Sequence, residues 1–216
     1  MSSALSHKNV HVLSHPLLSH GLSVLRSKAT PQSEFRRVLA ELSRFIAYES
    51  SRDLALKAEP IETPFEKTEG FFISEGLTMV SILRSGMGML DGFLQIFPEA
   101  NVGHIGIYRD KFLHNTVEYY FRVPDDSHNN KVFLLDPLLA TGSTVAAAVR
   151  RLKQYGFRHI RLNCILASEQ GIDLLHHEHP DVDIYCLSIE RALGDLGYLL
   201  PGLGDAGDRL YGTRRI

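Results

Sequence analysis

Cysteine is scarce in this sequence, and its scarcity excludes one class of protein. The two cysteines, Cys164 and Cys186, each lie in a short apolar run that is typical of a buried strand. Two cysteines are too few for the disulfide framework of a small secreted domain, so both are expected to be buried, reduced thiols. We therefore expect a cytoplasmic protein.

Long hydrophobic runs and an excess of one charge are missing as well. No apolar stretch approaches the ~20 residues of a membrane span, and residues 1–15 contain no apolar signal core. The formal net charge is -2 at pH 7, which leaves no general basic field for nucleic acid. Hydrophobic residues make up 44% of the 216 positions, enough for the core of one α/β domain that spans residues 1–216.

The most informative stretch combines a strand, a loop of small residues and a helix. Val132 to Leu135 is an unbroken apolar run that predicts a buried parallel strand, and Asp136 closes it. An alanine-rich segment with arginines predicts a helix over 145–153, capped by Ser143 or Thr144. Asp136 therefore lies at the carboxyl end of a strand, where α/β sheets bind ligands.

The loop before this helix is a candidate phosphate site. Its residues are Pro137, Leu138, Leu139, Ala140, Thr141, Gly142, Ser143 and Thr144. Backbone N–H groups and partial positive charge at a helix N-terminus suit a phosphate monoester, and a preceding carboxylate can accept from ribose hydroxyls. The loop lacks the lysine of a P-loop and the three spaced glycines of a dinucleotide loop. The alternative is a tight connection with a helix cap.

A second candidate loop follows the apolar strand predicted over 77–83. Residues 84–88 place Arg84 and Ser85 beside two glycines, which let backbone approach a ligand closely. A guanidinium can fork onto two oxygens of a diphosphate. Taken alone, this segment is better interpreted as a helix-entry turn with a surface arginine; the second loop at the same sheet edge favours the diphosphate site. Because both loops follow strands of one sheet, we expect them to meet at the same edge.

The rest of the chain alternates strands and helices around a mixed N-terminal arm over 10–26. A helix is predicted to begin at Pro31 with Thr30 as its cap. Its apolar stripe comprises Phe35, Val38, Leu39, Leu42, Phe45 and Ile46. Further strands are predicted over 61–65, 101–108, 116–123, 160–167 and 184–189, and helices over 89–97 and 169–177. This alternation predicts a largely parallel sheet with right-handed crossovers.

The segment 105–123 predicts a long antiparallel ribbon. The aromatic and β-branched residues of 116–123 are typical of its second strand. For Glu118 and the aromatic residues after it, packing across strands or between subunits is the preferred interpretation.

Three histidines near one helix end, His176, His177 and His179, do not predict a metal site. Their spacing puts them on different faces, and Pro180 ends the helix. We expect a solvated helix end.

The C-terminal stretch YLLPGLGDAGDRLYGT, residues 198–213, is the second candidate site. Its four glycines break regular structure, so we expect an irregular loop, and long irregular loops are usually functional or disordered. Regularly spaced leucines argue against disorder. Exposed backbone N–H and C=O groups in such a loop would complement a planar heterocycle.

Four motifs resemble the uracil phosphoribosyltransferases among the type I phosphoribosyltransferases. They are Asp-Pro-Leu-Leu-Ala-Thr-Gly, ILRSGMGMLDG, GHIGIYRD followed by VEYYFRVP, and Pro-Gly-Leu-Gly-Asp-Ala-Gly-Asp. The resemblance covers roughly residues 10–213. It implies a central, mostly parallel sheet flanked by helices, an antiparallel ribbon over the site and a C-terminal base-binding hood. The N-terminal arm and helix would occupy about 10–55, the core about 70–190 and the hood about 191–216.

The resemblance also implies the reaction and its residues. Uracil and phosphoribosyl diphosphate (PRPP) would give UMP and diphosphate, with Mg²⁺ held mainly through PRPP and near Asp205. Asp205 and Arg109 would be catalytic. PRPP would contact Arg84, Arg109, Asp136, Asp205 and every residue from Pro137 to Thr144, and uracil would contact Leu199, Gly204, Asp205 and Ala206. A homodimer or larger oligomer is implied, GTP is a candidate activator, and no partnership with nucleic acid or membrane is expected.

Four positions depart from the family pattern. Ser85 replaces a usual Ala, Ser143 a Gly, Thr144 a Ser and Leu199 an Ile. The change at Ser143 bears on the geometry of the phosphate loop. Two other functions stay open: a catalytically silent member that binds PRPP or a nucleotide and regulates a partner, and an RNA-binding regulator, which the near-neutral charge disfavours.

Overall fold

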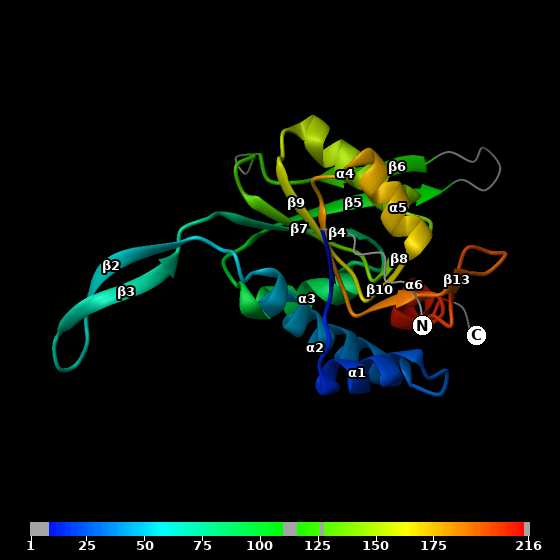
Figure 1. Ribbon diagram of the computed structural model, residues 1–216, viewed down its shortest axis with the longest axis horizontal. Helices are drawn as coiled ribbons and strands as arrows, with labels where there is room; N and C mark the ends of the chain where they lie inside the picture. Colours follow the sequence, from blue (N-terminus) through cyan, green and yellow to red (C-terminus); the bar gives the residue numbers. More distant parts are fainter. Residues whose placement is uncertain (1–8, 110–115, 126–127, 214–216) are drawn as a thin grey trace.

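A seven-stranded sheet lies at the centre of the molecule, in the order β1-β11-β9-β7-β4-β5-β6 (Figure 1). The computed structural model describes residues 9–109, 116–125 and 128–213. The strands are β1 (Val10–Val12), β4 (Leu77–Leu83), β5 (Asn101–Arg109), β6 (Thr116–Arg122), β7 (Lys131–Leu135), β9 (His159–Asn163) and β11 (Asp183–Cys186). All neighbours pair in parallel except β5 and β6, which are antiparallel. The predicted mostly parallel sheet is confirmed.

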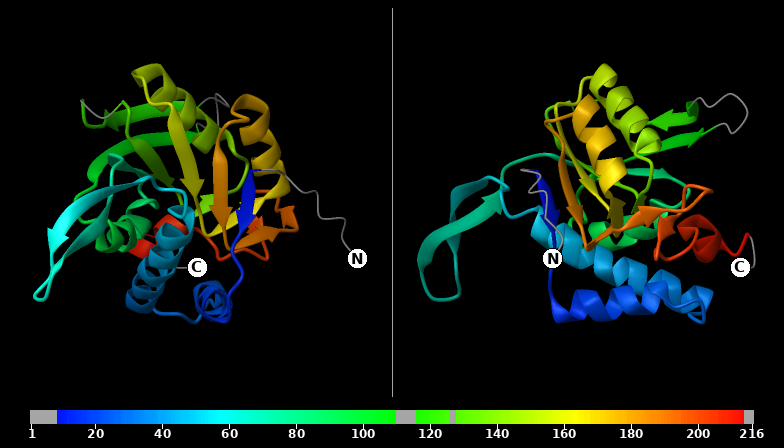
Figure 2. Two further views of the ribbon diagram at one scale, coloured as in Figure 1. Left: turned by 60° about the vertical axis from the view of Figure 1, so that its left-hand side comes forward. Right: turned by 45° about the vertical axis from the view of Figure 1, so that its right-hand side comes forward.

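Helices cover both faces of this sheet (Figures 1 and 2). One face carries α4 (Ser143–Tyr155) and α5 (Glu169–Glu178), and the other carries α1 (Pro16–Arg26), α2 (Gln32–Ser50) and α3 (Met87–Ile96). Along β7, Val132 and Leu134 pack into the first layer, whereas Phe133 and Leu135 pack into the second. Burial on both faces explains the unbroken apolar run, and each such side chain contributes about 1.5–3 kcal/mol.

The N-terminal arm is more regular than the sequence predicts. β1 adds a parallel strand beside β11, and α1 packs against α2. The predicted start of α2 is wrong by one residue, because Pro31 keeps an extended backbone with ψ 153° and serves as the cap residue. The Thr30 hydroxyl instead donates to the Val24 carbonyl at 2.6 Å. Phe45, expected in the apolar stripe, is 42% exposed.

A β-hairpin projects away from the body of the molecule (Figures 1 and 2). Its strands are β2 (Leu56–Glu62) and β3 (Lys67–Ile73), paired in antiparallel register over their whole length. The sequence predicts only a short strand at 61–65, so this prediction is wrong in extent. Exposed aromatic side chains lie along the hairpin, including Phe65 at its turn, which is 96% exposed.

Two predicted strands are each broken in two where the chain leaves the main sheet. The segment 160–167 divides into β9 and β10 (Leu166–Ser168), and 184–189 divides into β11 and β12 (Ser188–Glu190). β10 lies between β12 and β8 (Leu138–Leu139) in a separate three-stranded parallel sheet. The break arises because the Ile165 and Leu166 amides both donate to the Pro137 carbonyl. This small sheet brings the segment after Asp136 beside the start of α5.

Cys164 and Cys186 are buried free thiols, as predicted. A side-chain hydrogen bond between Cys164 and Cys186, together with burial, raises the pKa of the Cys164 thiol. Within the described ranges, no helix combines the length and apolarity needed to cross a bilayer.

Candidate functional site

Asp136 ends β7 at the carboxyl edge of the sheet, and its side chain is buried. The residue is 8% exposed, and the Ser85 hydroxyl donates to its Oδ1 at 3.1 Å. Burial raises its pKa from 3.8 to about 7, although hydrogen bonds from Ser85 and the Leu138 amide act in the opposite direction. The negative charge of Asp205 contributes to the same rise. A carboxylate held this way is ready to accept hydrogen bonds from a polar ligand.

The small-residue loop, residues 140–144, leads into α4. Gly142 is the cap residue, with φ 84°, and no side chain caps the helix, so the predicted cap at Ser143 or Thr144 is wrong. The Ser143 hydroxyl instead lies 3.0 Å from that of Thr141. The first amides of α4 have no intrahelical partner and face the loop, which makes this helix end suited to an anion.

Neighbouring backbone fixes the shape of this loop. A methyl group built on Gly142 would lie 2.8 Å from the Gly171 carbonyl oxygen, and one on Gly171 would lie 2.5 Å from that of Ala140. The Ser168 hydroxyl donates to the Ala140 carbonyl at 2.5 Å and accepts from the Gly171 amide at 2.9 Å. The sequence analysis missed Ser168, although a serine before Glu169 is a readable helix-cap signal.

The hood, residues 191–213, contains more regular structure than predicted. It includes β13 (Ala192–Leu193), β14 (Leu199–Leu200) and the short helix α6 (Ala206–Tyr211). Asp205 caps α6 by accepting from the Asp208 amide at 2.8 Å. The prediction of a wholly irregular loop is therefore wrong. Gly202 and Gly204 have φ of 62° and 81°, a conformation that bends the chain into α6.

The arginine turn, residues 84–88, lies against the hood. Arg84 Nη2 is 3.6 Å from Asp208 Oδ1 and 3.5 Å from the Thr213 hydroxyl. The Tyr211 hydroxyl donates to the Arg84 carbonyl at 3.1 Å, and the guanidinium lies 5.7 Å from the centre of the Tyr211 ring. The Arg84 side chain is still half exposed, so its donors are open to a ligand.

The N-terminal helices hold the hood from below. Glu190 forms a buried ion pair with Arg26 at 2.5 Å and accepts from the Gly202 amide at 2.8 Å. Burial alone would raise the pKa of Glu190, but these partners and Ser188 hold it below its usual value. Arg209 donates to the Leu203 carbonyl at 2.9 Å and to carbonyls of Leu25 and Ser27. These contacts of Arg26 and Arg209, called the clamp below, were not predicted, because the partners are far apart in the chain.

A hollow of about 680 Å³ opens between the small-residue loop and the turn of the hood. Ala140, Thr141, Ser143 and Thr144 line one side, and the segment 193–197 lines the other. A methyl group on Gly197 would lie 3.8 Å from the Thr141 methyl carbon, so the two segments nearly touch. The space suits a compact polar ligand bound at the start of α4.

Most residues predicted for the site gather at this edge. Arg84 contacts Asp208 of the hood, whose amide bonds Asp205, and the neighbouring Ser85 contacts Asp136. The small-residue loop faces the hood across the hollow, and Leu199 and Ala206 are buried within the hood. Gly204 is exposed at its surface. The backbone of Arg109 ends β5, but its side chain and the ribbon tip at 110–115 lie outside the described residues.

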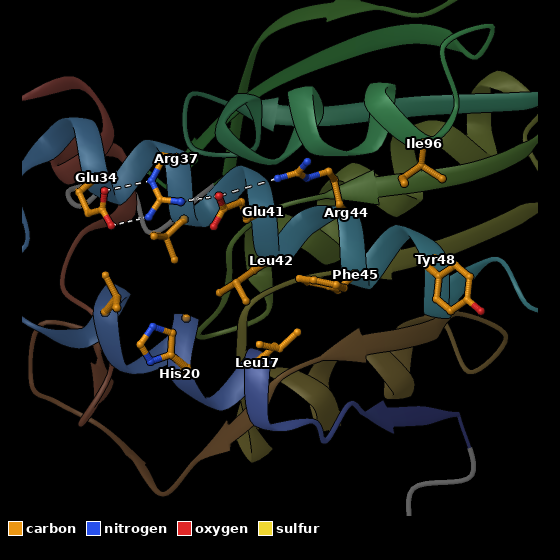
Figure 3. A pocket seen from close by; sticks show the side chains of 13 residues that line it. Leu17, His20, Glu34, Arg37, Glu41, Leu42, Arg44, Phe45, Tyr48 and Ile96 are labelled. Atoms are coloured by element: carbon orange, nitrogen blue, oxygen red, sulfur yellow. Dashed lines mark hydrogen bonds and ion pairs between the residues drawn. The ribbon is translucent and has the colours of Figure 1, made fainter.

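Two other polar or hollow regions lie apart from this edge. A groove between α1 and α2 has an apolar floor that includes Leu42 and Phe45, and Arg37 pairs with Glu34 and Glu41 at its rim (Figure 3). Among the described residues, no three metal-ligating side chains converge. His179 differs from the predicted solvated end, because it is buried and its Nε2 lies 3.1 Å from the Ala146 carbonyl.

Known proteins share the sequence and the fold. A family model for uracil phosphoribosyltransferase matches residues 12–213. Proteins named uracil phosphoribosyltransferase from Polaromonas naphthalenivorans and Legionella pneumophila are 50% and 47% identical; each match covers 95% of this chain, and 99% and 96% of those proteins.

Solved structures of other proteins share the fold of this chain. A protein from Aquifex aeolicus superposes with a TM-score of 0.90 at 32% identity, over 96% of this chain and 100% of that one. The adenine phosphoribosyltransferase of Trypanosoma brucei, crystallised with AMP, pyrophosphate and ribose-5-phosphate, gives a TM-score of 0.59 at 17% identity, covering 91% and 90%. The predicted type I phosphoribosyltransferase fold is thus confirmed.

Proposed function

The chain belongs to the uracil phosphoribosyltransferase family, and on that premise we propose that it converts uracil and PRPP to UMP and diphosphate. The observation that carries the proposal is the junction of three elements at one sheet edge. Arg84 contacts the hood through Asp208, while the neighbouring Ser85 contacts Asp136. A sugar held at Asp136 would therefore lie between a cation for its diphosphate and a hood for its base.

Each part of PRPP finds a chemical complement. The free amides at the start of α4 and the hydroxyls of Thr141, Ser143 and Thr144 bind the 5′-phosphate, and Pro137, Leu138, Leu139, Ala140 and Gly142 shape that loop. Asp136 accepts from the ribose hydroxyls. Arg84 neutralises the diphosphate, with Arg109 approaching from the ribbon.

The hood supplies the base site. Leu199, Gly204 and Ala206 offer backbone groups to uracil, which has two carbonyl acceptors and two N–H donors, and Asp205 lies between the base and PRPP. In the reaction a bond forms between uracil N1 and ribose C1 as the bond from C1 to diphosphate breaks and N1 loses its proton. Positioning and electrostatic stabilisation of the developing sugar cation lower the barrier.

Magnesium fits this set of donors. Mg²⁺ commonly binds one or two carboxylates and completes its shell with substrate oxygens. The described residues offer no all-protein cage, while the half-buried Asp205 carboxylate stands at the hood edge. We include Mg²⁺ held mainly through PRPP, with Asp205 beside it. When bound, the ion neutralises charge on the diphosphate.

The proposal extends to the assembly, location and control of the enzyme. The projecting hairpin exposes Phe65, Phe71 and Phe72, which supports a homodimer or larger oligomer in which a second copy covers them. Two buried free thiols support a reducing, cytoplasmic location. The whole chain acts as one phosphoribosyltransferase domain, and GTP is its candidate activator.

A radiolabelled assay with uracil, PRPP and Mg²⁺, run with and without GTP, tests these statements. We expect UMP from uracil and none from cytosine, whose amino group places a donor where uracil has an acceptor. A silent regulator would bind PRPP in calorimetry yet form no UMP under any condition. An RNA-binding regulator would retain RNA on a filter in a salt-dependent way. Either result would overturn the proposed activity.

A further inference from the structure

The turn that carries Ser85 is pressed against the end of the strand that carries Asp136. β4 and β7 pair in parallel, with Ser81 opposite Leu135. A methyl group on Gly86 would lie only 2.3 Å from the Leu135 carbonyl oxygen, so the turn sits against β7 without a gap. This close fit sets the Ser85 hydroxyl 3.1 Å from Asp136 Oδ1.

Four described groups interact with the Asp136 carboxylate. The Ser85 hydroxyl reaches it from the β4–α3 turn and the Leu138 amide from β8. The charge of Asp205 acts on it from the hood, and its own charge contributes to the raised pKa of Cys164, at the bend after β9. The two hydrogen bonds favour the ionised carboxylate and offset only part of the rise in pKa that burial and the like charge cause.

We propose that Ser85 is a positioning residue for the transfer reaction: its hydroxyl fixes one oxygen of Asp136, so that the carboxylate presents its other oxygen to the ribose hydroxyls of PRPP. The inference rests on the proposed function. An ionised, correctly turned carboxylate accepts hydrogen bonds from both ribose hydroxyls, whereas a protonated one offers a donor that the sugar does not need. Ser85 thus acts on sugar binding through Asp136 and does not contact the reacting bond.

Ser85→Ala, which restores the alanine usual at this position in the family, tests whether this chain depends on the hydroxyl for positioning Asp136. Ser85→Thr retains the hydroxyl, and Ser81→Ala is the matched control. Ser81 is a buried serine on β4, the strand that leads into the turn of Ser85. Its hydroxyl forms a hydrogen bond with His104 Nδ1 at 2.7 Å and not with Asp136. For Ser85→Ala we expect KM for PRPP to rise roughly tenfold at pH 7, with KM for uracil unchanged. The acid limb of kcat/KM should move upward by roughly one pH unit.

Ser85→Thr should keep the acid limb of the kcat/KM profile at its wild-type pH. Ser81→Ala should change neither KM for PRPP nor the pH of that limb. A wild-type pH profile in Ser85→Ala, or an equal shift in Ser81→Ala, would overturn the inference. Calorimetric titration of PRPP at pH 6 and pH 8 repeats the comparison without turnover. If wild type forms no UMP, the proposed activity fails, and the PRPP affinities of the same variants still decide the role of Ser85.

Discussion

Arg84 and Asp208 meet at 3.6 Å between Nη2 and Oδ1, which joins the turn after β4 to the last helix of the chain. Asp208 is 9% exposed, whereas the Arg84 side chain is half exposed. The buried carboxylate therefore orients an arginine that solvent can still reach. Substrate diphosphate can bind this guanidinium while the hood keeps its hold on the same side chain.

Replacing Arg84 by Ala should reduce kcat/KM for PRPP by about ten- to a hundredfold, because charge-assisted hydrogen bonds contribute about 1.5–3 kcal/mol. Arg84→Lys should recover only part of the loss, since an ammonium cannot fork onto two oxygens. Steady-state kinetics measure both. Arg52→Ala is the control, because Arg52 pairs with Glu49 on the exposed surface of α2. Equal activity in Arg84→Ala and Arg52→Ala would contradict the assignment.

Gly142→Ala and Gly171→Ala should each weaken PRPP binding, because both glycines lie where the small-residue loop packs against the start of α5. Gly142 has φ 84°, and added methyl groups would meet backbone oxygens at 2.8 Å and 2.5 Å, respectively. Either change must displace the small-residue loop from the start of α4. Calorimetry with PRPP and a thermal melt of each variant separate lost binding from lost fold. Wild-type affinity in a folded Gly142→Ala protein would refute the phosphate-loop assignment.

The two roles of Asp205 can be separated by two substitutions. Asp205→Ala removes both its charge and the cap on α6, so we expect lost UMP formation and a stability loss of about 0.5–2 kcal/mol. Asp205→Asn retains a cap-forming side chain, and should unfold at nearly the wild-type temperature while remaining inactive. Thermal melts and the UMP assay on both proteins check this. An active Asp205→Asn enzyme would show that the charge is dispensable.

Asp136→Asn should stabilise the protein while abolishing activity. Because the pKa of Asp136 rises from 3.8 to about 7 on folding, the folded state binds a proton that the unfolded state has lost between these values. The Asp136 contribution therefore weakens stability as pH increases from about 4 to 7. The variant's advantage should be absent near pH 4 and reach at most about 4 kcal/mol at pH 8.

Urea unfolding at pH 4, 6 and 8 measures this advantage, and Asp53→Asn is a control of opposite sign. A hydrogen bond from Arg161 is the main cause of the lowered pKa of Asp53, although burial opposes it. Its stabilisation is present above the unfolded pKa and is lost as pH falls through the lower, folded value. Asp53→Asn should thus be destabilised most at pH 8, and an equal response of both variants would contradict the burial argument.

Burial decides which parts of this protein can be predicted from its sequence. The apolar run Val132–Leu135 was predictable, and so were the loops that follow β7 and β4 at the same sheet edge. A strand covered on both faces must be apolar, and it ends where polar residues begin. The β2–β3 hairpin was not predictable, since all but one of its strand residues are exposed and neither strand has an inward face to impose alternation.

The hood shows the second limit. The four glycines of residues 198–213 concealed α6, although Asp205 followed by Asp208 carries the signature of a capped first turn. The contact of Ser85 with Asp136 and the clamp of Arg26 on Glu190 depend on which strands become neighbours. No local pattern encodes such partners, so the motifs identified the site while its supporting contacts required the structure.

The clamp beneath the hood also orders events during synthesis of the chain. Arg26 and Glu190 are 164 positions apart, and Arg209 bonds the Ser27 carbonyl across 182 positions. At roughly 5–20 residues per second, α1 waits on the order of ten seconds or more on the ribosome before its hood partners emerge. Until then Arg26, at the C-terminal end of α1, lacks its partners in the hood. The residues of the phosphate loop are therefore synthesised before those of the hood, and the contacts that join the hood to α1 are among the last that the chain can form.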